Sequence, residues 1–342
     1  MKRRWLLRSL RNSKVVIIVA LIVSITVLTA VFGYKSNFFL GGADSISVTV
    51  AWNPGSISDD LTRALINSTD TRVSQINMPG ANGATGANFV FNSAQGVDNL
   101  LSTHLSALVT SRAMGFSEFL CSDWTAWLCA FSPAIIVVAD NSPYKTMNDL
   151  IADIRANPGE VRAANSGFGT ISFTAAELLS LKVVLELEQI SFAGSSPTVS
   201  AVLAGEADFA VLLSTDIIGQ LQTGNLRAIG AFSETDFVIK NGDAQITISS
   251  VSGLDGRLDS LLPFGEYYGF FAPSGLSNSQ LNKLEETIKT ATAAEIFEEF
   301  IANKGLLKVP TDRRNGNEVT AAYSLLVNQT LYDAGFLPVN PS

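Results

Sequence analysis

The chain has 342 residues, of which 47% are hydrophobic and 16% are charged, and its formal net charge is −8. This length accommodates two domains of ordinary size, and the composition excludes a disordered protein. Residues 1–35 carry seven Lys or Arg and no acid, so 16 basic residues face 31 acidic ones in the remainder, a net charge of −15. A body this acidic argues against nucleic acid as a partner.

An uncharged apolar run of 18 residues, 15–32, follows the basic start of the chain. As a helix it would span about 27 Å, close to the thickness of a bilayer core. Residues 1–35 are therefore expected to be a signal or membrane anchor with its basic end in the cytoplasm, and residues 36–44 a spacer. An uncleaved inner-membrane anchor and a cleaved signal peptide both fit this pattern. Either one places the rest of the chain in the periplasm.

Beyond residue 44, short apolar runs typical of strands alternate with runs that carry apolar residues on one helical face. Strands are expected at 45–52, 73–77, 133–139, 161–165, 187–192, 208–213, 226–232 and 267–272. Helices are expected at 59–66, 147–156, 172–183, 197–204, 216–222, 279–290, 293–303 and 319–332. This alternation predicts an α/β fold built on mostly parallel sheets flanked by helices. Residues 234–262 are rich in Gly, Asp, Ser and Asn and are expected to form a loop-rich excursion.

The first strand-to-helix turn is Asn53–Asp59 (NPGSISD), in which Ser58 or Asp59 is expected to cap the helix. Such a helix start points unpaired backbone N–H groups and the positive end of the helix dipole at one spot. That arrangement suits a carboxylate or a phosphate. One turn of this kind is weak evidence, but the sequence repeats it.

Two further turns follow the same plan. Met78–Gly86 is rich in glycine, which allows positive φ, but it lacks the Gly-Lys-Ser/Thr ending of a phosphate loop. It is therefore either a binding loop or a plain turn. Ser166–Ser172 (SGFGTIS) has hydroxyl residues on both sides of a Gly-x-Gly step, and Thr170 or Ser172 is expected to cap the following helix.

A fourth turn is Ala193–Thr198, in which Ser196 is expected to be the N-cap and Pro197 the first helical residue. In open α/β sheets, ligands bind at the carboxyl ends of the strands, where these turns lie. Together the turns predict one anion held mainly by backbone N–H and hydroxyl groups.

The residues that usually carry metal or enzyme chemistry are scarce. Cys121 and Cys129 lie eight residues apart, and in an exported protein they form either a disulfide, which we favour, or two buried thiols. His104 is the single histidine, so a zinc site is not expected, and its apolar neighbours indicate a structural role. The chain has no Gly-x-Ser-x-Gly elbow and no His-Glu-x-x-His pair. We therefore expect no catalytic residue, no metal and no cofactor.

The order and spacing of the motifs between Ser45 and Pro338 resemble those of the extracytoplasmic solute receptors of tripartite tricarboxylate transporters, the Bug or TctC family. The segments that carry the resemblance are Pro54–Asp59, Asn77–Gly86, Pro143–Leu150, Asn157–Gly159, Ser166–Ser172, Gly194–Leu203, Gly224–Arg227 and Gly269–Pro273. The chain departs from the family pattern at Ser56 and Asn82, which replace glycines, and at Leu212, which replaces an acid. The loss at Leu212 leads us to expect a more apolar far end of the pocket.

The resemblance implies a two-lobed periplasmic binding protein of type II-like fold that closes on a small organic carboxylate and delivers it to integral-membrane permease subunits. Lobe 1 would comprise 45–138 and 265–342, lobe 2 would comprise 139–264, and the receptor would be a monomer. Carried over by position, the ligand-binding residues are Pro54, Gly55, Ser56, Ser58, Asp59, Ser166, Gly167, Thr170, Ser172, Gly194, Ser195 and Ser196.

Two other functions remain open at this point. The same fold could sense a ligand and signal to a partner kinase, an alternative that an uncleaved anchor favours. An exported hydrolase on this scaffold would need a nucleophile and a base, and the sequence offers no such pair. Uptake of carboxylates after deletion of the gene separates transport from sensing.

Overall fold

The computed structural model describes residues 45–93, 99–184 and 186–337 of the chain. The predicted signal or anchor at 1–35, with its apolar run at 15–32, and the predicted spacer at 36–44 lie outside these residues. Within the described ranges, no helix is both long and apolar enough to cross a membrane.

The strands form one ten-stranded sheet and a separate two-stranded hairpin in the described part of the chain. The large sheet runs in the order β2-β1-β3-β11-β4-β7-β5-β6, and β8 and β12 pair with β4 as well. Its members are β1 (Ser45–Val50), β2 (Arg72–Asn77), β3 (Asn99–His104), β4 (Trp124–Ala139), β5 (Arg162–Asn165), β6 (Glu188–Ser191), β7 (Phe209–Leu213), β8 (Leu226–Ala231), β11 (Gly265–Pro273) and β12 (Leu307–Lys308). Pairing is parallel among β1, β2 and β3 and among β5, β6 and β7, whereas β4 and β11 run antiparallel to their neighbours.

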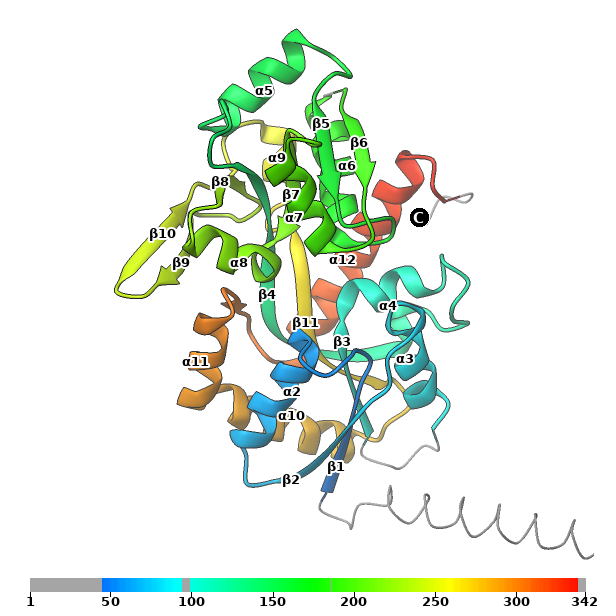
Figure 1. The fold of residues 1–342 in the computed structure, drawn as a ribbon. Helices are drawn as coiled ribbons and strands as arrows, with labels where there is room; N and C mark the ends of the chain where they lie inside the picture. Colours follow the sequence, from blue (N-terminus) through cyan, green and yellow to red (C-terminus); the bar gives the residue numbers. More distant parts are fainter. Residues whose placement is uncertain (1–44, 94–98, 185, 338–342) are drawn as a thin grey trace, which may run out of the picture.

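The long strand β4 connects the two halves of the sheet, as Figure 1 shows. Its residues up to Pro133 pair with β11, and its residues from Ala134 onward pair with β7 and β8. Almost all of its side chains are buried, which explains its continuous apolar sequence. The close contact with β11 requires Gly265, because a Cβ added there would lie 2.1 Å from the Ser132 carbonyl oxygen.

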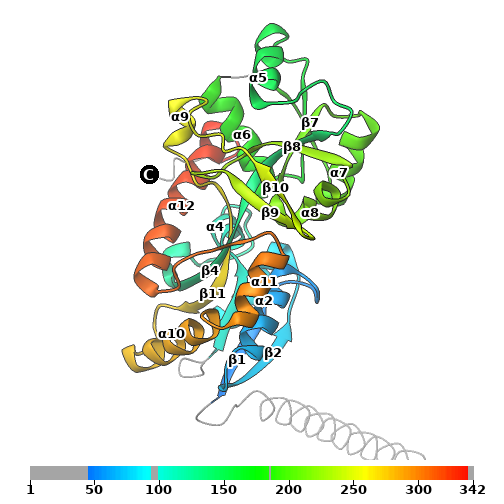
Figure 2. The ribbon, with the colours of Figure 1, turned by 90° about the vertical axis from the view of Figure 1, so that its left-hand side faces the viewer.

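In the half that contains β1, helices cover both faces of the sheet (Figures 1 and 2). On one face pack α2 (Ile57–Asn67), α10 (Asn278–Thr292) and α11 (Glu295–Asn303), which share a core with the apolar side chains of β1. On the other face pack α3 (Ala84–Phe91), α4 (Leu105–Ser111) and the long α12 (Arg313–Asp333). Helix α12 also contacts α6, so it reaches into the other half.

The second half contains α5 (Met147–Ala156), α6 (Ile171–Val183), α7 (Ser195–Ala204), α8 (Ser214–Gln222) and the short α9 (Gly256–Asp259). Their starts follow from local sequence. Thr146 and Asp149, for example, form a reciprocal capping box that begins α5 at its predicted first residue. The predicted loop-rich excursion is only partly correct, because it contains α9 and the hairpin of β9 (Phe237–Asn241) and β10 (Ala244–Ile248). Phe237 and Ile239 in that hairpin are buried, which ties it to the core.

The expected disulfide is not formed. Cys121, in the short helix η2 (Cys121–Asp123), and Cys129, in β4, are both free and buried. They belong to different core clusters, on opposite faces of the sheet, so their side chains cannot meet. Burial raises the pKa of the Cys121 thiol to about 12, and that of Cys129 is raised as well. Both behave as inert core residues.

The division into lobes at residues 138/139 and 264/265 stays a prediction. β11 begins at Gly265, at the second boundary, whereas β4 changes its partners between Pro133 and Ala134, before the first boundary.

Candidate functional site

A cavity of about 830 Å³ lies between the two halves of the sheet, and residues from both line it. From the half with β1 come the start of α2, the Asn82 turn, the end of β3 and one stretch of β11. From the half with β5 come the starts of α6, α7 and α8. The cavity therefore faces several helix N-termini, as the repeated strand-to-helix turns predicted.

The first turn reaches this cavity through Gly55 and Ser56. Ser56, and not Ser58 or Asp59 as predicted, caps α2 by accepting the Asp59 N–H at 3.2 Å. The buried Asp59 carboxylate instead holds the turn together, accepting the Gly55 N–H and the Arg63 Nε–H, each at 2.9 Å. Burial alone would raise the pKa of Asp59, but the hydrogen bonds from Gly55, Asn77 and Arg63 outweigh it and hold the pKa below its usual value.

The second predicted turn is both a turn and a part of the cavity wall. Gly80 and Gly83 adopt φ of 135° and 86°, which side chains disfavour, and they reverse the chain before α3. This reversal places Asn82 on the cavity lining.

The third turn reaches the cavity from the opposite half through Ser166, Thr170 and Ser172. Thr170 caps α6 as predicted, accepting the Phe173 N–H at 3.2 Å. The Ser172 hydroxyl is almost completely buried, accepts the Ser166 N–H at 3.0 Å and donates to the Val211 carbonyl oxygen. Ser172 therefore fixes the shape of the turn.

The fourth turn contributes Gly194 and Ser195. Here the predicted cap is wrong, because α7 begins at Ser195 and its N-cap is Gly194, with φ of 106°. Thr198 favours this start, because its hydroxyl donates to the Gly194 carbonyl oxygen at 2.8 Å and closes the first turn. Pro197 then lies within that turn, where its missing N–H needs no helical partner.

Seven of the twelve predicted binding residues line the cavity, and five do not. The five are Pro54, Ser58, Asp59, Gly167 and Ser196. Gly167 allows two backbone segments to pack closely, because a Cβ added there would lie 2.9 Å from the Phe192 carbonyl oxygen. A binding role for the other seven stays a prediction.

The aromatic wall of the cavity was not predicted. The His104 ring stacks on Trp52, with centroids 4.2 Å apart, and meets the edge of Tyr268 at 4.9 Å. Its Nε2 is buried and has no hydrogen-bond partner within the described ranges, and burial lowers the pKa of the imidazole to about 3. The expected structural role of His104 agrees with this packing, but the residue also lines the cavity as a neutral ring.

Three charged residues on the lining were also missed: Asp216, Glu266 and Lys304. Burial raises the pKa of Glu266 to about 8, although Ser106 donates its N–H to this carboxyl at 3.1 Å and its hydroxyl as well. The Lys304 ammonium lies 2.6 Å from the Asp60 carboxylate, outside the lining. Sequence signals existed, since Glu266 interrupts an apolar strand and Asp216 lies in the first turn of the helix that directly follows β7.

The expected apolar far end is therefore only partly present. Leu212 is fully buried in the core and does not line the cavity. The replacement of an acid at this position therefore does not change the polarity of the cavity lining. Leu213 and Ile218 do line it, but Asp216 stands between them.

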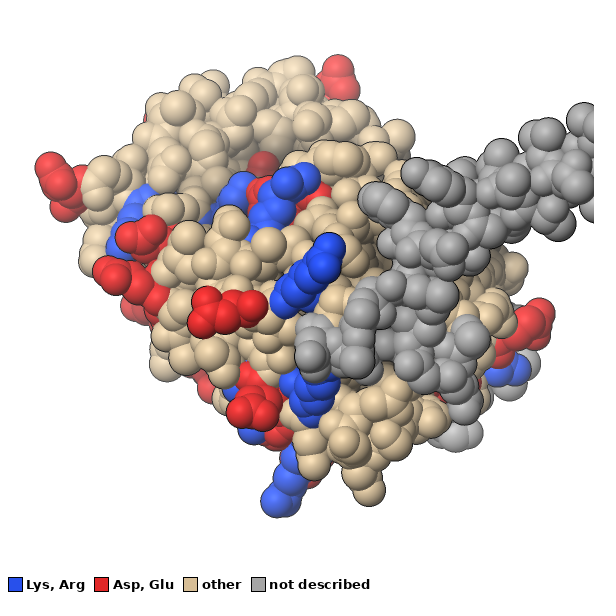
Figure 3. Space-filling view, turned by 90° about the horizontal axis from the view of Figure 1, so that it is seen from below, with Lys and Arg blue, Asp and Glu red and all other residues tan. Residues whose placement is uncertain are grey.

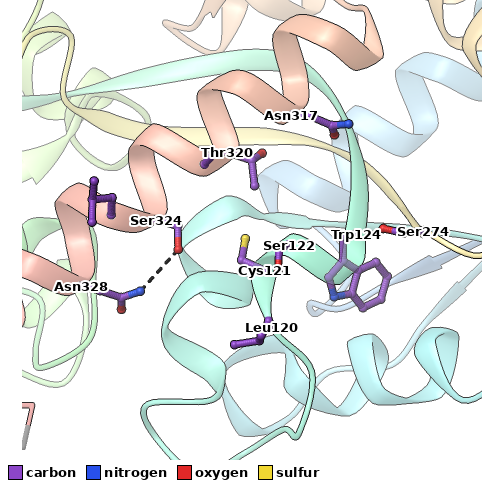
Figure 4. A pocket seen from close by; sticks show the side chains of 11 residues that line it. Leu120, Cys121, Ser122, Trp124, Ser274, Asn317, Thr320, Ser324 and Asn328 are labelled. Carbon is purple, nitrogen blue, oxygen red and sulfur yellow. Dashed lines mark hydrogen bonds between the residues drawn. The ribbon is translucent and has the colours of Figure 1, made fainter. Parts of the chain in front are cut away.

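A second cavity, of about 490 Å³, lies beside α12 and η2 (Figure 4). It is lined by uncharged residues, among them Trp124, Asn317 and Thr320, and by none of the predicted binding residues. Asn328 donates to Ser324 across one turn of α12 at 3.4 Å, the hydrogen bond drawn in the figure. Because all these residues come from one half of the molecule, the first cavity is the candidate functional site.

Comparison with known proteins identifies the family. The model of the tripartite tricarboxylate transporter family receptor matches residues 125–324. A UPF0065 protein of Bordetella pertussis is 26% identical over 175 residues, which are 51% of this chain and 52% of that protein. A second UPF0065 protein, from a Pseudomonas species, is 29% identical over 183 residues, 52% of this chain and 51% of that protein. The chain thus spans about half the length of these curated relatives.

Solved structures confirm the predicted fold of a periplasmic binding protein. A TctC solute-binding protein from Polaromonas has a TM-score of 0.71 at 19% identity, covering 85% of this chain and 99% of its own. The periplasmic binding protein BugD has a TM-score of 0.62 at 19% identity, covering 87% and 99%. Since the family model covers more than half of the chain, this protein belongs to the tripartite tricarboxylate transporter receptors, a family of solute receptors rather than enzymes.

Proposed function

We propose that this receptor captures a small organic carboxylate in the cavity between its two halves and hands it to a permease of the tripartite tricarboxylate type. The observation that carries the proposal is the convergence of helix starts from both halves on one cavity, with Ser56 and Thr170 as their caps. Each such helix end favours an anion by about 0.3–1 kcal/mol when exposed, and by up to about 2 when partly buried.

Structural relatives support a carboxylate as the ligand class. One Rhodopseudomonas palustris protein, with a TM-score of 0.60, was solved with malate, and another, with a TM-score of 0.66, was solved with adipate. Both are below 20% identical to this chain, so they support the class of ligand and not its identity.

The proposal includes an extracytoplasmic location and a monomeric receptor. The basic start and the apolar run at 15–32 would export the body, either as an inner-membrane anchor or as a cleaved signal. On the face shown in Figure 3, acidic and basic side chains are interspersed and form no single basic patch, which agrees with a partner other than nucleic acid.

Calorimetry on the full-length protein in mild detergent tests the binding site, with malate, adipate and citrate as probes. We expect saturable binding that Gly55→Val weakens at least about tenfold, because a branched side chain at φ +84° distorts the turn at the cavity. Gly159→Val is the matched control, since Gly159 has φ +77° and similarly open surroundings but lies outside the cavity lining.

Two results would reject parts of this proposal. Equal binding by the Gly55 and Gly159 variants would reject the placement of the site. Normal carboxylate uptake in cells that lack the gene would reject transport and favour the sensing alternative.

A further inference from the structure

The cavity assigned above to a carboxylate carries an acid that faces it without a basic partner. Among the described residues, no Lys or Arg pairs with Asp216, whose carboxylate accepts the Ser195 hydroxyl at 2.7 Å. Asp216 is exposed to the cavity and lies at its wall together with Ser195. Desolvation by the surrounding protein raises the pKa of the Asp216 carboxyl, and the hydrogen bond from Ser195 only partly offsets this effect.

The remaining charges on the lining do not offset Asp216. Of the described lining residues, Lys304 alone is basic, and its ammonium is already 2.6 Å from the Asp60 carboxylate. Glu266 is a second acid, whose pKa of about 8 keeps it mostly protonated at neutral pH. No arginine lines the cavity within the described ranges. The local field therefore opposes a ligand that carries negative charge at both ends.

A second observation points to a ligand in the same cavity, and it comes from the opposite half of the molecule. The His104 Nε2 is buried and has no hydrogen-bond partner among the residues that the structure describes, although the residue lines the cavity. A buried polar atom is rarely left unpaired, so a ligand group is a natural partner for it. Because the ring is neutral, it can hydrogen-bond a ligand without repelling a nearby cation.

Resting on the proposed function, we infer that the ligand is an amino carboxylate, whose ammonium group pairs with Asp216 while its carboxylate occupies the helix starts at Ser56 and Thr170. Such a ligand supplies the cation that Asp216 lacks, and its net charge near zero avoids the repulsion that a dicarboxylate would meet. The cavity would thus select against simple diacids.

The experiment has to separate the pairing of Asp216 with a ligand from a simpler role of this residue in its own helix. It lies in the first turn of α8, where an acid stabilises the helix dipole. Asp216→Asn keeps the size of the side chain and an acceptor for Ser195, but it removes the charge. Asp243→Asn is the control for charge alone, because Asp243 is exposed in the β9–β10 turn and outside the cavity lining.

The test compares ligands matched in length by calorimetry on the full-length protein at pH 7. The six-carbon set is hexanoate, adipate, 2-aminohexanoate and 6-aminohexanoate, and the four-carbon set is butanoate, succinate, 2-aminobutanoate and 4-aminobutanoate. We expect at least one amino carboxylate to bind about tenfold or more tightly than the diacid and the plain acid of its length. Asp216→Asn should reduce that preference by about tenfold or more, and Asp243→Asn should leave it unchanged.

The outcomes separate this inference from the proposed function. If diacids or plain acids bind at least as tightly as the amino acids, the inference is overturned and the carboxylate receptor stands. If no member of either set, nor malate or citrate, binds, the proposed function fails and the inference fails with it. Should Asp216→Asn not fold, the order of affinities in the unmodified protein decides the question.

Discussion

At the scale of single residues, the shape of the cavity depends on some side chains that do not line it. Asp59 is almost fully buried. At the first turn its carboxylate accepts hydrogen bonds from the Gly55 N–H and from the side chains of Arg63, Gln75 and Asn77. This network holds the backbone that the proposed function assigns to the ligand. Asp59, which the family motif predicts to be a ligand-binding residue, therefore supports the loop.

Asp59→Ala tests this support. The change leaves the half-buried amide groups of Gln75 and Asn77 without this acceptor, so we expect the free energy of unfolding to fall by about 1–3 kcal/mol and ligand affinity to fall as well. Chemical denaturation and calorimetry measure the two effects. Asp70→Ala, at an exposed position, is the control and should change neither. Unaltered affinity in a folded Asp59 variant would contradict the role given to Asp59.

Glu266 makes stability depend on pH. Its pKa is about 8 in the folded protein, against a usual value of 4.5, because burial and the nearby Asp216 disfavour its charge. Between these two values the folded state keeps a proton that the unfolded chain releases, so stability falls as pH rises from about 4.5 to 8. The slope from this group is up to about 1.4 kcal/mol per pH unit.

Glu266→Gln should remove this slope. We expect the variant to gain stability relative to the unmodified protein as pH rises from 5 to 8, which urea unfolding at each pH unit measures. Glu160→Gln, at an exposed position, is the control and should follow the unmodified protein. Parallel stability curves for the Glu266 variant and the unmodified protein would show that Glu266 does not hold the proton.

At the scale of elements, strands β4 and β11 connect the halves and bring their helix starts to one cavity. Their close approach depends on glycines, since a Cβ at Gly265 would lie 2.1 Å from the Ser132 carbonyl oxygen and one at Gly269 would lie 2.3 Å from that of Trp127. Tertiary pairing therefore accounts for residues whose identity has no local explanation in an apolar strand.

Gly265→Ala should push β11 away from β4 and lower the free energy of unfolding by roughly 1–3 kcal/mol. Thermal unfolding monitored by circular dichroism measures the loss. Gly219→Ala is the contrasting control, because Gly219 lies in α8 with open space around its Cα and alanine favours a helix there by up to about 1 kcal/mol. Equal unfolding temperatures for the two variants would refute the steric argument.

At the scale of the whole molecule, the cavity has walls in both halves, which predicts that ligand binding draws the halves together. Only β4, β11, α12 and a few loops need to bend, because most other contacts stay within one half. Small-angle scattering with and without a ligand found by calorimetry should show a smaller radius of gyration in the bound state. Identical scattering curves at saturating ligand would contradict closure.

Local sequence predicted much of this protein. Helix starts such as Thr146 at α5 and Thr170 at α6 follow from hydroxyl caps, and the α/β order follows from the periods of apolar residues. A predicted N-cap was wrong where another side chain stabilises a different first turn of the helix, as Thr198 does in α7. The hairpin of β9 and β10 was not predicted, because polar residues surround its few inward-facing apolar positions and obscure the alternation of a strand.

The sequence by itself determined the alternation of strands and helices, though not β3, β9, β10, β12, α3, α4 or α9, and it determined the four glycine- and hydroxyl-rich turns and the family that the protein belongs to. These depend mostly on residues close together in the chain. Tertiary structure alone decided which residues face the cavity. Asp216, Glu266 and His104 are far apart in sequence, and they meet there because the ends of β3 and β7 and the start of β11 face the same cavity. Burial by distant segments, and not local pattern, sets their charge states and so the chemistry that the cavity offers to a ligand.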